Sequence, residues 1–189
     1  MFLPRDEVLA LGLAEVGRDV LIDSAAVIMG AGAIRIGDHT RIDAHSILSA
    51  GSGGIDLGRH VHVAAAAHLW GAAGIRMGNF AAVSARASVY SATDDYAEGY
   101  LSNPTVPDTL RKVTSAPVEI ADMAVVGCGS VVMPGVRLGT GSAVGALSLV
   151  ARSVPDYAFV AGNPLRGVGQ RSRERLADLV RRHDVSGCC

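Results

Sequence analysis

Residues 120–155 read IADMAV, VGCGSV, VMPGVR, LGTGSA, VGALSL and VARSVP when they are cut into sixes. Each block opens with Ile, Val or Leu, and its fifth residue is small or β-branched throughout. If the first and fifth residues point inward along short strands, the rest of each block turns a corner, and three blocks make one triangular coil. The stretch therefore predicts a solenoid of short parallel strands.

The same spacing extends upstream. Coils open at six positions: Val16, Ile36, Leu57, Met77, Ile120 and Leu138. Small insertions lengthen some coils at one corner, and one large insertion, residues 95–119, must leave the coil as a loop. Each coil can pair its backbone with the next at a spacing of about 4.8 Å, with small inward residues stacked in columns. We therefore expect an all-β solenoid, a parallel β-helix of about six triangular coils.

Helical patterns occur only near the two ends of the chain. Residues 16–154 show no helical periodicity, which argues against an alternating α/β domain. Asp6–Leu11 and Ser172–Arg182 have helical patterns, and we expect them to cap the solenoid as short helices. The expected organisation is an N-terminal cap (1–15), the β-helix with its extruded loop (16–155), and a C-terminal turn and helix (156–189).

Composition and charge exclude several classes of function. Lys plus Arg (17) nearly balances Asp plus Glu (18), so no basic surface predicts a nucleic-acid or anionic-membrane partner. The N-terminal MFLPRDEVLALG resembles neither a signal peptide nor a membrane span, and a cytoplasmic location is the default expectation. Three cysteines are too few for a disulfide framework, and the pair Cys188 and Cys189 is expected to be a solvated tail.

Residues 125–164, VVGCGSVVMPGVRLGTGSAVGALSLVARSVPDYAFVAGNP, resemble the hexapeptide-repeat acyltransferases, whose C-terminal coils close with a similar AGNP turn. The segments LGLAEVGRDVLID (11–23) and SATDDY (91–96) are further similar to a branch that acylates hydroxyls of sugars or polysaccharides. The resemblance implies a left-handed coil, a homotrimer, and direct transfer of acetyl from acetyl-CoA to a sugar or a related small molecule. We expect no metal. The left hand runs against the usual crossover rule, so periodicity alone would not predict it.

The segment VYSATDDY (89–96) departs from the family pattern at a decisive position. In the galactoside and maltose acetyltransferases this strand ends in a histidine general base, whereas here Asp94 occupies the position. An ordinary carboxylate is a poor base for an alcohol, so another group should supply the base or the acceptor should be easier than an alcohol. We expect His62 to be the base, with Asp94 or Asp95 of a neighbouring subunit bonded to its ring.

Further site residues follow from the resemblance. Backbone at Gly145 and Ala146 is expected to contact the pantetheine arm of CoA, and Cys128 to line the groove near the thioester. Ala151, Arg152 and Arg166 match positions near the nucleotide of CoA. Apart from the resemblance, Trp70 and Tyr90 lie one coil apart and are candidate contacts for a sugar ring together with the extruded loop, because sugar rings stack on aromatic faces.

Alternatives remain open at this point. The acceptor could be the amine of an amino sugar, which would explain the missing histidine. A metal enzyme of the γ-carbonic-anhydrase type is suggested by His39 and His60, expected to stack in successive coils beside His62. Its His-x4-His spacing is replaced here by His62-x5-His68. A non-catalytic scaffold is the third class, with Asp94 and Asp95 serving only turn chemistry and His62 only solvated.

Overall fold

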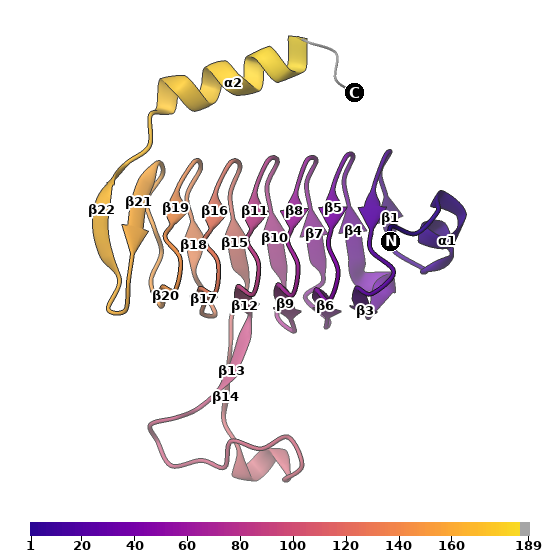
Figure 1. Ribbon diagram of the computed structural model, residues 1–189. Coiled ribbons are helices and arrows are strands. Elements are labelled where there is room, and N and C mark those ends of the chain that lie inside the picture. Colours follow the sequence, from indigo (N-terminus) through magenta and orange to yellow (C-terminus); the bar gives the residue numbers. More distant parts are fainter. Residues whose placement is uncertain (186–189) are drawn as a thin grey trace.

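The computed structural model describes residues 1–185, which form a three-sided prism of stacked coils (Figure 1). The predicted all-β architecture, a left-handed parallel β-helix of about six coils, is confirmed. Residues 186–189, including Cys188 and Cys189, lie outside the described residues.

Three parallel sheets form the sides of the prism, and we call them the first, second and third faces. The first face contains β1 (Glu15–Val16), β4 (Ile34–Ile36), β7 (Ile55–Leu57), β10 (Ile75–Met77), β15 (Val118–Ile120) and β18 (Arg137–Leu138). The second contains β2 (Leu21–Ile22), β5 (Arg41–Ile42), β8 (His62–Val63), β11 (Ala82–Val83), β16 (Val125–Val126), β19 (Ala143–Val144) and β21 (Ala158–Ala161), with β22 (Arg166–Gln170) added antiparallel. The third contains β3 (Val27–Met29), β6 (Ile47–Ala50), β9 (His68–Gly71), β12 (Ser88–Tyr90), β17 (Val131–Val132) and β20 (Leu149–Val150).

The core is a set of inward columns, as the six-residue repeat predicts. In the second face Ile42, Val63, Val83 and Val126 stand in register, and each is fully buried. Each column buries its apolar surface against the same position one coil away, so a single coil has no core of its own.

Backbone at the corners adopts left-handed conformations that let a two- or three-residue strand turn sharply. At corner A, between the first and second faces, His39, His60 and Phe80 have φ of 56°, 56° and 59°. Their rings stack in turn, with centroids 4.8 and 4.9 Å apart. Burial lowers the pKa of His60, and the charges of His183, His39 and Arg59 add to this effect.

The two helices take different places on the prism. Helix α1 (Arg5–Ala10) lies at the N-terminal end, as expected for a cap, with Val8 buried. Helix α2 (Arg173–Val185) differs from the expected end cap because it runs back along the coils over corner A (Figure 1). An ion pair of 3.0 Å between Arg59 and Asp184, and a contact of His183 with the His60 ring, hold its far end there.

The extruded segment is a hairpin arm that begins and ends earlier than the expected loop 95–119. It comprises β13 (Ala92–Asp94), the 3-10 helix η2 (Asp108–Leu110) and β14 (Val113–Ser115), and it projects away from the prism at corner C, between the third and first faces (Figure 1). The Ala116 N–H donates to the Ser91 carbonyl at 2.9 Å, which closes the coil behind the arm. Val118–Ile120 is therefore already a coil strand.

Candidate functional site

Corner B, between the second and third faces, aligns one residue from each coil just after the second-face strand. Backbone bonds from Asp43 to Val63, from Ala64 to Val83 and from Ser84 to Val126 set this register. The aligned column is Asp43, Ala64, Ser84, Gly127 and Gly145. Asp23 stands one coil earlier in the same column, and small residues in its middle leave Asp43 and Ser84 on either side of an alanine.

His62 forms a dyad with Asp43 of the same chain. Its Nε2 lies 2.8 Å from Asp43 Oδ2, and the Nε of Arg41 donates to Oδ1 of the same carboxylate at 2.6 Å. The Asp43 side chain is 16% exposed and that of His62 46%. Burial alone would raise the pKa of Asp43, but the hydrogen bonds from His62 and Arg41 outweigh it, so the pKa lies below its ordinary value. The ionised carboxylate accepts from Nε2–H, which leaves Nδ1 as the His62 atom able to accept a proton.

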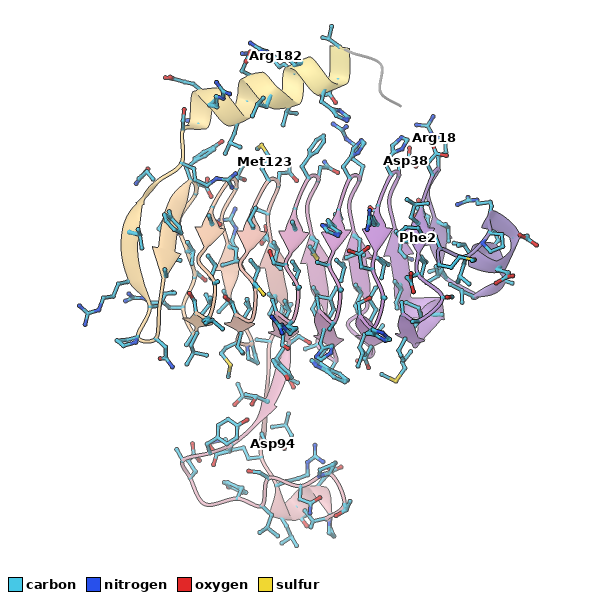
Figure 2. The ribbon with its side chains drawn as sticks, viewed as in Figure 1. Phe2, Arg18, Asp38, Asp94, Met123 and Arg182 are labelled. Atoms are coloured by element: carbon cyan, nitrogen blue, oxygen red, sulfur yellow. The ribbon has the colours of Figure 1, made fainter. Side chains whose placement is uncertain are left out.

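This dyad supplies within one chain the carboxylate that we expected from a neighbouring subunit. We expected Asp94 or Asp95 of a neighbouring subunit to bond the His62 ring, whereas Asp43 already occupies Nε2 within the chain. The signal was present in the sequence, because the register that pairs Arg41 with His62 also brings the next coil-end residue, Asp43, beside that ring. Within one chain Asp94 lies on the arm, away from the second face (Figure 2).

Asp94 and Asp95 have different surroundings. The Asp95 carboxylate builds a turn, since the Glu98 N–H donates to its Oδ2 at 2.7 Å. Asp94 ends β13 and faces Val113 across the hairpin. Its Oδ1 is buried and has no hydrogen-bond partner within residues 1–185. Leaving a buried acceptor without a hydrogen bond costs about 1–3 kcal/mol of free energy. Asp94, and not Asp95, is therefore the aspartate whose carboxylate lacks a hydrogen-bond donor.

The residues expected to contact CoA fall on two corners. Cys128, a half-buried free thiol, and the exposed Ala146 lie at corner B, whereas the exposed Ala151 and Arg152 lie at corner C, beyond β20. Arg152 Nη2 donates to the Leu165 carbonyl at 3.0 Å, next to Arg166. Gly145 has a packing reason of its own, because a Cβ there would lie 2.8 Å from the Ala161 Cβ. The CoA contacts of these residues stay predictions.

The aromatic pair forms as the register predicts. Trp70 and Tyr90 are direct neighbours in the third face, and their rings stack with centroids 6.4 Å apart and an angle of 13°. The Trp70 Nε1 is buried and has no hydrogen-bond partner in the described chain. The pair therefore offers a flat surface with one unused donor, which suits a polar ring; its role as a substrate contact stays a prediction.

The three histidines of the γ-carbonic-anhydrase alternative do not form a cluster of metal ligands. His39 and His60 do stack, but His62 turns to Asp43 instead of joining them. Across residues 1–185 no group of three or more His, Cys, Asp and Glu side chains could hold a metal ion. No helix in this part of the chain has the length and apolar character needed to cross a membrane.

A separate groove lies over the first face. It has a volume of 1040 Å³ and is lined by charged side chains of alternating sign. We call this set the charge ladder: Glu15, Arg35, Asp56, Arg76, Glu119 and Arg137. Neighbouring members pair with one another, for example Arg35 with Asp56 at 3.7 Å and Arg137 with Glu119 at 3.4 Å. The groove contains none of the expected site residues, and its charges are satisfied internally.

Known proteins match both the sequence and the fold, although no family model matches the chain. The dTDP-4-amino-4,6-dideoxy-D-glucose acyltransferase of Escherichia coli is 34% identical over 175 residues, which cover 93% of this chain and 91% of that protein. AntD, an N-acyltransferase from Bacillus cereus solved with dTDP and 3-hydroxybutyryl-CoA, is 35% identical with a TM-score of 0.94, covering 98% of this chain and 97% of AntD. Other structures of AntD carry replacements of its Ser84 or Asp94.

These matches extend over nearly the whole chain, well beyond the repeats themselves. The chain belongs to the hexapeptide-repeat acyltransferase family, and it is an acyltransferase that uses an acyl-CoA donor. The predicted family, enzyme class and donor are therefore confirmed. Ser84 was not singled out from the sequence, although its place in the Asp43 column could have drawn attention to it.

Proposed function

We propose that the chain transfers an acyl group from acyl-CoA to the amine of a nucleotide-linked amino sugar, with Asp94 holding that amine. The observation that carries this proposal is the buried, unpartnered Oδ1 of Asp94. An amine is a hydrogen-bond donor, and a bond from it to a carboxylate is charge-assisted. The relatives named for dTDP-4-amino-4,6-dideoxyglucose support the substrate class.

An amine acceptor explains better than a hydroxyl acceptor why Asp94 stands where some relatives have a catalytic histidine. A neutral amine is already nucleophilic and needs no proton removed before it attacks, whereas an alcohol does. A carboxylate at position 94 can therefore orient the acceptor without being a strong base. The replacements at Ser84 and Asp94 in AntD concern residues that this chain also carries at those numbers.

His62 supplies the base in this proposal, and Asp43 fixes it. With Nε2–H donated to Asp43, the ring keeps one orientation and presents Nδ1 to accept the proton that the amine releases. His62 acts on the acceptor, whereas Asp43 acts through His62 as a positioning residue. Asp95 has no chemical part because its carboxylate is used in the arm's turn.

A homotrimer is needed to join the two parts of the site. His62 lies on the second face and Asp94 on the arm at corner C, so a neighbouring chain must bring the arm to corner B. The outer surfaces of the second and third faces support such an interface, because Leu21, Val27 and Met29 are 41–45% exposed there. The first face carries the charge ladder and remains in water. Apolar side chains exposed on two faces and charges on the third match an assembly around one axis.

The reaction is direct transfer in a ternary complex. The amine nitrogen attacks the thioester carbonyl carbon, forming the C–N bond and a tetrahedral oxyanion that backbone N–H groups near the thioester stabilise. The C–S bond then breaks, CoA leaves as the thiolate, and the proton from nitrogen passes to His62. No acyl-enzyme is formed.

We also propose that the protein is cytoplasmic.

The test compares two acceptors that differ in one group. The purified protein is given acetyl-CoA or 3-hydroxybutyryl-CoA with either dTDP-4-amino-4,6-dideoxyglucose or dTDP-glucose, and release of the CoA thiol is followed. We expect turnover with the amino sugar at a kcat/KM at least about 100-fold above that with dTDP-glucose, because only the amine is nucleophilic without prior deprotonation. Faster turnover of the hydroxyl sugar would refute the proposal, as would no turnover of either.

A further inference from the structure

The two sides of the arm differ in how their polar groups are satisfied. Asp94 pairs with Val113 in the hairpin, and the Asp95 N–H donates to the Lys112 carbonyl at 2.9 Å, so the pairing continues one residue further. Arg111 follows in extended backbone, with φ −126° and ψ 157°. Because side chains alternate along extended strands, Asp94, Val113 and Arg111 share one side of the arm, and Asp95 and Lys112 share the other.

The Asp95 side is satisfied within the arm. Lys112 Nζ pairs with Glu98 Oε1 at 2.5 Å, and this bond raises the pKa of Lys112. The ammonium also lies 5.9 Å from the centre of the Tyr100 ring. Asp95 accepts the Glu98 N–H. Asp95 and Lys112, the charged residues on this side of the arm, therefore both have partners within the arm.

The Asp94 side has two buried polar atoms of opposite character and no bond between them. Arg111 Nε, like Asp94 Oδ1, is buried without a hydrogen-bond partner in the described chain. The Arg111 side chain is 21% exposed. The same Nε makes a loose ion pair of 3.7 Å with Asp108 Oδ1, and the Asp108 side chain is 98% exposed. A buried guanidinium donor without a hydrogen bond is costly, and Asp108 lies too far away to accept one, so this side of the arm lacks a molecule that offers Asp94 a donor and Arg111 an acceptor.

A nucleotide-linked amino sugar carries both groups in one rigid unit. Its amine and its anomeric phosphate lie on opposite sides of a pyranose ring, a separation comparable to the roughly 7–8 Å between diagonal neighbours on one side of a hairpin. Arginine also binds phosphate through a planar fork that lysine does not have. We infer that Arg111 binds the diphosphate of the acceptor while Asp94 holds its amine. This inference rests on the proposed function, because it takes the acceptor from it.

Phosphoryl groups have two sources in this reaction, the acceptor and CoA, and binding measurements separate them. Calorimetric titrations of the full-length protein use dTDP, thymidine and CoA as probes. The variant is Arg111→Gln, and the matched control is Lys112→Gln, which removes the same charge on the other side of the arm. Arg111→Lys tests whether the charge alone is sufficient.

We expect Arg111→Gln to weaken dTDP binding by about 10- to 100-fold and to leave thymidine and CoA binding within about twofold, since one charge-assisted contact is lost. Lys112→Gln should leave all three unchanged, and Arg111→Lys should restore part of the dTDP affinity.

Three outcomes would overturn the assignment of Arg111. Loss of CoA affinity instead of dTDP affinity assigns the arginine to the donor. Unchanged dTDP affinity with a dissociated trimer in sedimentation assigns it to a subunit contact. If the wild-type protein does not bind dTDP, a nucleoside diphosphate is excluded as the ligand of Arg111. If dTDP binding depends on Arg111 but the amino sugar is not acylated, the inference holds and the proposed reaction fails.

Discussion

Replacing Asp94 should give a graded loss of turnover without a loss of stability. A hydrogen bond to a charged group contributes about 1.5–3 kcal/mol, and a neutral one about 0.5–1.5 kcal/mol. Asp94→Ala removes the bond to the amine, so kcat/KM should fall by about 10- to 160-fold at 1.36 kcal/mol per factor of ten. Asp94→Asn keeps an oxygen acceptor without the charge and should cost about 5- to 13-fold.

The stability of the same variants distinguishes a substrate contact from a structural one. Asp94 Oδ1 has no partner in the described chain, so Asp94→Ala removes a buried, unsatisfied group and should not lower the melting temperature. Asp95→Asn is the matched control: it keeps the oxygen that accepts the Glu98 N–H, and its kcat/KM should stay within about twofold.

The assay is CoA-thiol release at varied amino-sugar concentration, with acyl-CoA saturating. Equal activity of Asp94→Ala and the wild type would refute the reasoning, because the unpaired oxygen would then have no part in binding the acceptor. A loss above about 1,000-fold in Asp94→Asn would also refute it, since that magnitude belongs to removal of the base itself.

Three further predictions concern the dyad, the assembly and corner A. His62→Ala should lower kcat/KM by about two to four orders of magnitude, and Asp43→Ala by about 10- to 100-fold. The KM for acyl-CoA should be unchanged in both variants. Near-normal turnover of His62→Ala would show that His62 is not the base. Val131→Asp places a charge on the outer third face and should convert trimers to monomers in sedimentation, which a persistent trimer would contradict. Because the lowered pKa of His60 makes the folded chain bind its proton less readily than the unfolded chain, thermal stability should fall as pH drops below the ordinary value of 6.5. His60→Phe should flatten that dependence, and an unchanged profile would contradict this origin.

The repeat made the coils predictable because each position depends on its equivalent one coil away. The stacking of His39 on His60 and of Trp70 on Tyr90 followed from the register alone. Corner geometry was harder to predict from composition, since residues such as His60 and Phe80 sit at positive φ only because the coil must turn there.

The site was less predictable where contacts depend on distant segments. The position of helix α2 is set by Arg59 and Asp184, which are far apart in the chain and carry no periodic signal. The Asp43 contact of His62 was not predicted, because the family resemblance points to the position of Asp94, whereas Asp43 reaches the ring only through the register of neighbouring coils. The use of Asp95 in a turn and the isolation of Asp94 depend on how the arm folds, which no coil repeat encodes.

The closure between Ser91 and Ala116 separates the arm from the prism that bears it. The chain leaves and re-enters at adjacent points of one coil, so the coils before and after the arm stack as though nothing had been inserted. Changes in arm length or sequence therefore do not alter the packing of the core. If the arm holds the acceptor as proposed, replacing this one segment would change acceptor preference without altering the coils.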